Sequence, residues 1–562
     1  MARLLTEKRV VGAIVVAVYA ITLAASLEGI GLTDDADFYM NASLKYAEWW
    51  GKVLSDAAHL KLTAFNQHTI DDYWQHNHEH PPLAKLVMGA SHAVFTKLLG
   101  VTKTTIDGIR MGTVLLSSAL ALLLFSLAWD MVGRAAAIFA PLALLAMPRF
   151  FFHSHVETLD VPVAATFFGA FYCFWKARDS WRWALAAGVA FGLALATKLN
   201  APFLFATLLV WWGVKNADDF AWVPGRGLAV PRVPLWIVSM AVLGAAVFFA
   251  LWPWMWFDTF ERMNSYIGFH MKHYGILFSY FGHIYDEKPF APWHAPWVMT
   301  GITTPPLTLL LGVFGAGLSA WWAVRRVPGP LISFGPSLSE ERRDFYTLVL
   351  LCAFISIGTV SFMPVPKYGG VKLFLPFFPF FALLGGVGVQ WLADHAAARL
   401  GDLTVITRSM RRRAVEVTLA LLLVAPAAVS TARAHPYHLS YYNMLIGGAE
   451  GAAKAGMERQ YYDVFYRDLA KWMSINLPPK AAVHFLPNNK EYVRSSPWYR
   501  KDGLMRPDIV FTQNMNQAQY LILTHEERWP EWPELKRRYG TLPSLYEISV
   551  EGVPLLNVYK LK

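Results

Sequence analysis

The chain has 562 residues, of which 55% are apolar and only 16% are charged. Because soluble domains carry about 25% charged residues, this composition excludes an ordinary water-soluble enzyme and predicts an α-helical polytopic membrane protein. The formal charge of +10 would suggest nucleic-acid binding in a soluble protein, whereas in a membrane protein it first indicates which loops face the cytoplasm. Cys173 and Cys352 lie inside apolar runs, so a disulfide framework is excluded.

Eleven apolar segments are candidates for membrane spans, since a helix needs about 20 mostly apolar residues to cross a bilayer. They lie near residues 10–31, 111–131, 136–148, 161–175, 183–197, 201–213, 234–252, 297–323, 346–363, 373–391 and 414–432. The first segment follows Lys8 and Arg9 and is longer than the about 7 to 15 apolar residues of a cleavable signal peptide. We therefore interpret it as an uncleaved signal anchor.

The distribution of basic residues predicts the orientation of these spans. On one side the connections hold Arg134, Lys176, Arg178 and the cluster at 411–413, while the short connections on the other side hold few basic residues. The positive-inside rule then places the N-terminus in the cytoplasm. Because eleven is odd, the C-terminus lies outside. The +10 charge is therefore a matter of topology, which removes the nucleic-acid interpretation.

The segment 81–99, PPLAKLVMGASHAVFTKLL, tests this map because it is apolar enough to resemble another span. It contains Lys85 and His92 and is amphipathic, and counting it as a crossing would place the 411–413 cluster outside. We therefore expect a helix that lies in the outer interface.

Two parts are expected along the chain. Residues 1–432 form a transmembrane catalytic domain, with large outer loops at 32–110 and 253–296. Residues 433–562 lose the membrane character and contain short strand-like runs such as AAVHFLP and YLILTH. These runs predict a small extracytoplasmic α/β domain.

The unusual polar residues of the membrane part all map to the outer face, which predicts a single outward-facing polar cavity. The candidates are Asp34, Asp35, His80, Lys85, Arg110, Glu157, Asp160, Lys198, His270, His273, Lys367 and Lys372. A carboxylate beside a like charge can act as a general base near neutral pH. Basic side chains at the same depth can hold a phosphate and stabilise its charge as it departs. Such a set suits transfer from a lipid-linked phosphate donor.

Two motifs resemble those of the protein O-mannosyltransferases. TDDADF at 33–38 resembles their Asp-Glu-x-His-Phe motif, and HPPLAKL at 80–86 resembles their His-Pro-Pro-Leu-x-Lys segment. Further segments are similar to bacterial relatives of that family and of the aminoarabinose transferases, namely ETLDVP at 157–162, TKLNAPF at 197–203, KYGGVKLFLPFFPF at 367–380 and HPYHLSYYNMLIGGAEGAAKAG at 435–456. The resemblance implies the GT-C fold and an inverting transfer of mannose or a related sugar from a polyprenyl-phosphate donor.

The resemblance also implies roles for individual residues. Asp34 would be the base that activates the acceptor, with Asp35 as its partner. Lys85 and Arg110 would approach the donor phosphate, and Glu157 and Asp160 would line the same cavity. The chain departs from the family at Glu79 (commonly Asp) and Lys372 (often Arg in bacterial relatives), and it lacks the β-trefoil domain of the eukaryotic enzymes, which leaves the acceptor open.

Simpler interpretations of the same residues stay open. Arg110 and Lys198 could be anchors that reach the interface, Glu157 and Asp160 could cap a helix, and His270 and His273 could serve interfacial packing. The triplet His76, His78 and His80 lacks an accompanying Cys, and we predict no metal ligands there. We expect no cofactor other than the lipid-linked substrate, with a divalent metal left open.

The main functional hypothesis is a glycosyltransferase of the cell membrane, or of the bacterial inner membrane if the source is bacterial. Its expected partners are a polyprenyl-phosphate sugar, a protein or envelope acceptor and the lipid bilayer, without nucleic acid. A transferase that modifies envelope lipid or polysaccharide is the first alternative. A transporter or lipid flippase is the second, although the sequence lacks the internal symmetry expected of many transporters. A sensor with a ligand-binding tail would leave the first-loop motifs unexplained.

Overall fold

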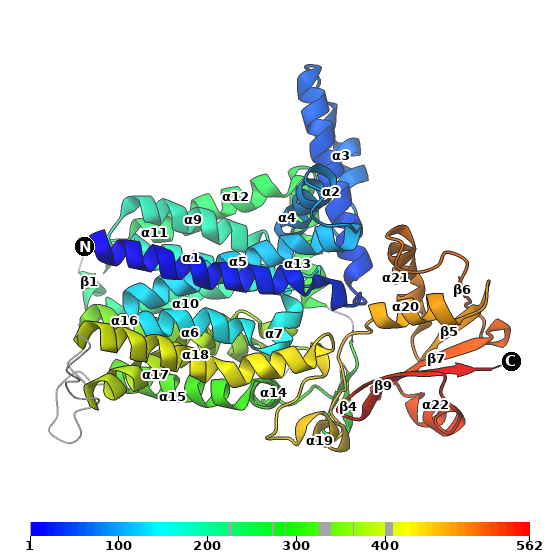
Figure 1. Ribbon diagram of the computed structural model, residues 1–562. Coiled ribbons are helices and arrows are strands. Elements are labelled where there is room, and N and C mark those ends of the chain that lie inside the picture. Colours follow the sequence, from blue (N-terminus) through cyan, green and yellow to red (C-terminus); the bar gives the residue numbers. More distant parts are fainter. Residues whose placement is uncertain are drawn as a thin grey trace.

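The computed structural model describes residues 2–223, 227–272, 275–286, 288–324, 339–362, 365–399 and 408–561. Long helices lie side by side in a bundle, and a small α/β domain sits at one end of it (Figure 1). The N-terminus lies at the opposite end of the bundle from that domain (Figure 1).

The predicted apolar segments are helical. Within the described residues, six helices are long and apolar enough to cross a membrane: α1 (Ala2–Ala25), α5 (Thr105–Met131), α15 (Pro306–Val324), α16 (Glu340–Ser361), α17 (Phe377–Arg399) and α18 (Arg408–Ala434). The other predicted spans correspond to α6 (Arg134–Leu145), α8 (Asp160–Ala177), α9 (Trp181–Leu195), α10 (Ala201–Lys215), and the pair α11 (Leu235–Val238) and α12 (Gly244–Leu251), which a π-helical turn joins. A helical, multi-pass membrane architecture is confirmed, while the sidedness stays a prediction.

The segment 81–99 forms α4 (Leu83–Ser91) and then a π-helical stretch, His92–Leu98. Together they are shorter than the roughly 20 residues that a span requires. A Cβ atom at Gly89 would lie 2.3 Å from the carbonyl oxygen of Ser43, and one at Gly112 would lie 2.7 Å from Cα of Met88. Glycine therefore lets α4 pack closely against α2 (Ala36–Ala58) and α5, which places Lys85 beside the site.

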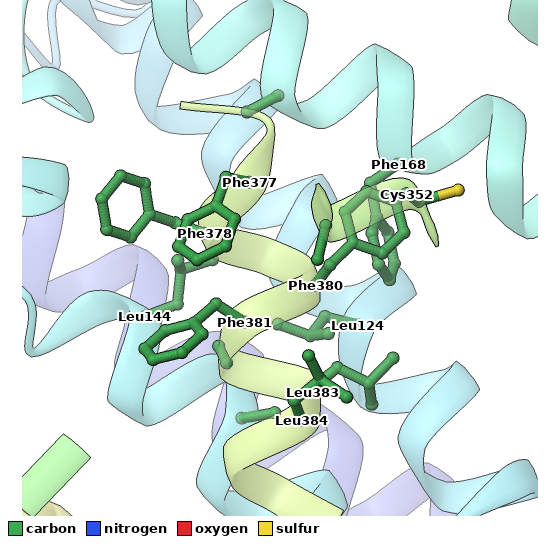
Figure 2. Close-up of a cluster of buried hydrophobic side chains, with 14 of the residues drawn as sticks. Leu124, Leu144, Phe168, Cys352, Phe377, Phe378, Phe380, Phe381, Leu383 and Leu384 are labelled. Carbon is green, nitrogen blue, oxygen red and sulfur yellow. The ribbon is translucent and has the colours of Figure 1, made fainter. Parts of the chain in front are cut away.

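Helix α17 is the most deeply buried of these six helices, and its side chains are buried from Phe377 through Gln390. Its phenylalanines form the aromatic cluster in Figure 2, where Phe380 lies 5.2 Å from Phe168 between ring centroids. On another face, a Cβ at Gly315 of α15 would lie 1.7 Å from the carbonyl oxygen of Leu384, so the two backbones touch. Such small-residue contacts stabilise packed membrane helices. The loop just before α17 is therefore anchored to a rigid helix.

The connections between the long helices carry short elements. These are α3 (Gln67–Trp74), α7 (Pro148–His153), α13 (Thr259–Met271), α14 (Ala295–Thr303) and the two-stranded sheet of β3 (Phe278–Tyr280) and β4 (His283–Tyr285). A second pair, β1 (Ala221–Val223) and β2 (Gly227–Ala229), lies between α10 and α11. Helices α2 and α3 project beyond the side of the bundle (Figure 1).

The end of the chain forms the predicted α/β structure. Its sheet has the order β6-β5-β7-β9-β8, in which β5 is parallel to both neighbours and β9 is antiparallel to both of its own. The strands are β5 (Ala482–Leu486), β6 (Val510–Phe511), β7 (Tyr520–Thr524), β8 (Tyr546–Val550) and β9 (Val553–Lys560), and the helices of this region are α19 (Gly448–Lys454), α20 (Arg467–Asn476), α21 (Asn489–Lys501) and α22 (Trp532–Tyr539). The predicted fold class is confirmed, whereas a division at residue 433 stays a prediction.

Candidate functional site

A cavity of about 380 Å³ opens where the ends of several helices meet. Its walls come from the start of α2, the turn before α4, the start of α8, the α9–α10 connection, the end of α13 and the loop before α17. The predicted residues that line it are Asp35, His80, Asp160, Lys198, His270 and Lys372. Residues from both predicted large loops and from three shorter connections therefore line one cavity.

Two ion pairs cross this cavity. The Lys372 Nζ atom lies 3.3 Å from Asp35 Oδ2, and Lys198 Nζ lies 2.7 Å from Asp160 Oδ1. Burial by itself disfavours the charge on Lys372, but the nearby carboxylates, Asp35 above all, hold its pKa above the ordinary value. Lys372 is therefore a permanent cation that faces the cavity.

Asp34 lies directly before α2 and is partly exposed. Withdrawal from water and, after it, the carboxylates of Asp35 and Asp463 hold the pKa of Asp34 well above its usual range, against the opposing effect of Lys372 and Arg528. A carboxylate with a raised pKa binds a proton more tightly, which suits a general base. Asp34 adjoins the cavity through Asp35, whose backbone N–H donates to Asp34 Oδ1 at 3.1 Å.

Asp160 is the first residue of α8, where the helix dipole favours a negative charge. Its Oδ2 atom accepts a hydrogen bond from the Tyr462 hydroxyl at 3.5 Å and lies 3.8 Å from Nδ1 of His153. Burial lowers the pKa of His153 to about 4, so the ring is neutral. Its Nε2 atom lies 2.6 Å from the Tyr461 hydroxyl.

The sequence analysis missed the contribution of Tyr461 and Tyr462. The Tyr462 ring also lies under the Lys372 ammonium, 4.5 Å from its centroid, so this tyrosine touches both ion pairs. The two residues stand where the family resemblance ends, in the sequence YYDVFY before the C-terminal sheet. The adjacent aromatic pair was the available signal, but its place in the fold depends on long-range contacts.

Lys85 does not line the cavity. It is fully buried, and its ammonium donates to the backbone oxygens of Asn77 at 2.6 Å and His80 at 2.8 Å. Burial lowers its pKa to about 7. Lys85 thus fixes the turn from which Glu79 and His80 face the cavity.

Arg110 and Glu157 also lie outside the cavity lining. They form a fully buried ion pair with 2.5 Å between Nε and Oε2. The same guanidinium donates to the carbonyl oxygens of Ile30 at 2.8 Å and Gly31 at 2.6 Å. The pair therefore holds the backbone that leads to Asp34, a place different from the expected one beside a donor phosphate.

His270 and Lys367 are two further predicted residues that line cavities here. His270 lines the main cavity and also a neighbouring one of about 360 Å³, in which Lys367 takes part. Lys367 donates to the carbonyl oxygen of Phe362 at 2.7 Å, and burial lowers its pKa to about 8. His273 lies outside the described residues. Among the residues described, no three His, Cys, Asp or Glu side chains are grouped to hold a metal ion.

Comparison with known protein families identifies one matching family model. The family model described as dolichyl-phosphate-mannose-protein mannosyltransferase matches residues 79–254. This region includes HPPLAKL together with Arg110, Glu157, Asp160 and Lys198. The match confirms the predicted resemblance to the protein O-mannosyltransferases in this region. Among curated proteins no relative matches the chain.

Two solved structures are similar in architecture. ArnT from Cupriavidus metallidurans, in a crystal structure bound to undecaprenyl phosphate, is 16% identical with a TM-score of 0.48 and coverage of 97% of each chain. The archaeal oligosaccharyltransferase AglB from Archaeoglobus fulgidus, in complex with an inhibitory peptide and a dolichol-phosphate, is 10% identical with a TM-score of 0.45 and coverage of 93% of this chain and 70% of its own. Since both TM-scores are below 0.5, neither similarity assigns a residue role or a ligand here.

Proposed function

We propose that the protein is a membrane glycosyltransferase that moves a sugar, mannose or a related hexose, from a polyprenyl-phosphate donor to an acceptor on the outer face. The observation that supports the proposal is the cavity that Asp35, Asp160, Lys198 and Lys372 line, with the base candidate Asp34 directly beside Asp35. Lys198 and Asp160 lie inside the matched region, and Lys372 and Asp35 complete the cavity from outside it.

In the proposed reaction an acceptor hydroxyl oxygen attacks the anomeric carbon of the sugar while the bond from that carbon to the phosphate oxygen breaks. The hydroxyl proton passes to the Asp34 carboxylate. The electron pair of the broken bond leaves on the polyprenyl phosphate. Attack from the face opposite the leaving group inverts the anomeric configuration.

Lys372 and Lys198 are the groups that would stabilise the departing phosphate. Each is already paired with a carboxylate that lines the cavity. A preorganised cation stabilises developing negative charge most when water is excluded. Lys372 is only 14% exposed and Lys198 17%. A bound phosphate would compete with Asp35 and Asp160 for these ammonium groups.

The acceptor has two candidate classes. A protein hydroxyl fits the family that the matching model describes. An envelope lipid or polysaccharide is the alternative, because the bacterial motif resemblance extends to the aminoarabinose transferases. Transport of an intact lipid-linked sugar is a further alternative, since charged groups between membrane helices also serve transporters.

The test is a transfer assay with purified protein in lipid and a panel of polyprenyl-phosphate sugars, each offered with a peptide or an envelope-lipid acceptor. Mass analysis of the products should show one sugar added to one acceptor class and free polyprenyl phosphate in equal amount. Movement of intact donor across vesicle membranes without any covalent product would contradict the proposal and support a transporter.

A further inference from the structure

The backbone that carries Asp34 and Asp35 is held from two sides. On the bundle side Arg110 binds the carbonyl oxygens just before it. On the other side Leu32 pairs with Phe465, with N–H···O distances of 3.0 and 2.7 Å in the two directions. The Tyr499 hydroxyl accepts from the Leu32 N–H at 3.1 Å and donates to the Phe465 carbonyl oxygen at 2.6 Å. The C-terminal region is therefore hydrogen-bonded to the backbone two residues before Asp34.

Helix α21 of the C-terminal region also contacts the segment that carries the carboxylates. Its Arg494 donates from Nη2 to the carbonyl oxygen of Asp34 at 2.5 Å, and its Nε lies 3.9 Å from Asp37 Oδ2. The guanidinium also lies 4.0 Å from the ring centroid of Phe38. One side chain thus contacts both Asp34 and the first turn of α2.

Trp498 makes a second contact from the same face of α21, since residues four apart lie above one another on a helix. Its indole N–H donates to Asp37 Oδ1 at 2.7 Å. The same oxygen accepts from the side-chain amide of Asn41 at 2.8 Å. Asp37 therefore links α21 to the first turn of α2. The Trp498 side chain is buried.

The group on Asp34 that Arg494 binds indicates its role. It binds the backbone oxygen of Asp34 and leaves the hydrogen bonds of the carboxylate to other groups. It therefore fixes the orientation of the residue without directly neutralising it. A reacting group must be held in its productive geometry, and a displacement of about 1 Å can cost about 100-fold in rate.

From this geometry we infer that α21 belongs to the transfer machinery, with Arg494 and Trp498 as positioning residues that hold Asp34 and Asp35 toward the cavity. The inference rests on the proposed function, in which Asp34 is the base. It gives the C-terminal α/β region a task in catalysis itself. The site is then assembled from two separate parts of the chain, and neither part contains it alone.

The test compares variants of the full-length protein in lipid by kcat and by KM for the donor. Arg494→Gln should lower kcat at least about tenfold with KM nearly unchanged, because the donor contacts stay in place while the base is misplaced. Arg494→Lys keeps a cation and a donor and should recover part of the loss. Trp498→Phe removes the indole N–H and should lower kcat in the same way.

Two controls separate positioning from domain stability. Lys490→Gln makes the same charge change at an exposed residue of α21 and should keep the original kcat. Arg500→Gln removes a hydrogen bond to the Ile509 carbonyl oxygen. Both partners belong to the C-terminal region, so this change tests the stability of that region. Thermal unfolding of each variant shows how much stability is lost.

A kcat for Arg494→Gln equal to that of Lys490→Gln would overturn the inference. It would also be overturned if Arg500→Gln lowered kcat as much as Arg494→Gln at the same loss of stability. Asp34→Asn is measured in parallel so that the two proposals fail separately. Full activity of Asp34→Asn would refute the assigned base, whereas an inactive Asp34→Asn beside a fully active Arg494→Gln would refute only the role of α21.

Discussion

Two ion-pair regions hold the segment that contains Asp34, one through residues 30 and 31 and the other through Asp35, and they differ in what surrounds them. The Arg110–Glu157 pair is fully buried, and its guanidinium also satisfies two backbone carbonyls. The Lys372–Asp35 pair faces a cavity, and its carboxylate is 34% exposed. The comparison teaches that a charged residue near a site can serve the fold or the chemistry, and that the groups around it decide which.

The largest expected effect on stability comes from breaking the buried pair. Arg110→Met leaves the Glu157 carboxylate buried without its partner, which costs about 3 to 5 kcal/mol of unfolding free energy. Transfer should fall together with the folded fraction. Chemical unfolding in detergent measures the change, and the double variant Arg110→Met/Glu157→Leu should recover part of it because no unpaired charge remains. Equal stability of wild type and Arg110→Met would contradict the structural role.

A smaller loss is expected at Lys85, which belongs to the buried side of the comparison although it adjoins the cavity. Lys85→Met leaves the carbonyl oxygens of Asn77 and His80 without their donor, which costs about 1 to 3 kcal/mol. Because the turn carries His80, KM for a substrate should rise as well. Unfolding and steady-state kinetics measure both effects. A fall in kcat at unchanged stability and KM would instead indicate direct contact with the departing phosphate.

Breaking the Lys372–Asp35 pair should affect the transfer rate much more than the stability. Lys372→Gln should change the unfolding free energy by only about 1 kcal/mol, as expected for a partly exposed ion pair. The rate of transfer should nevertheless fall about 100-fold, because a preorganised group that stabilises the leaving phosphate is lost. Single-turnover rates and unfolding curves of the same preparation test this directly. Loss of stability and activity in proportion would erase the distinction between the two regions.

The smallest effect is a shift in pH dependence. Asp34 must be ionised to accept a proton, so activity should rise with pH through its raised pKa. Lys372 opposes that raised pKa, so its removal should raise the pKa further. The ascending limb of kcat/KM in Lys372→Gln should therefore move to higher pH. A limb that stays in place, measured across the acid range, would contradict the assigned base.

The sequence predicts much of this architecture because membrane spans depend on local apolar length. The predicted segments are helices, and residues from distant connections meet in one cavity. The short helix α4 was also foreseen, since Lys85 and His92 make its segment amphipathic. These features follow from composition within windows of about 20 residues.

What the sequence could not predict depends on packing between distant segments. Arg110 and Lys372 are both basic residues near span ends, yet Arg110 is sealed by Glu157 and by the carbonyl oxygens before Asp34. Nothing local distinguishes them. The contribution of Tyr462 and Arg494 was missed for the same reason, because these residues reach the site across more than 300 residues of chain.

The most direct test of the central claim is the single-turnover rate of sugar transfer by Asp34→Asn, with the exposed first-loop residue Asp72→Asn as the matched control. An Asn at position 34 keeps nearly the same shape but cannot take the acceptor proton. Transfer should fall by about 100-fold or more, as expected when a general base is removed, while donor binding and the Asp72→Asn rate stay near those of the unchanged protein. Transfer at the original rate by Asp34→Asn would contradict the account.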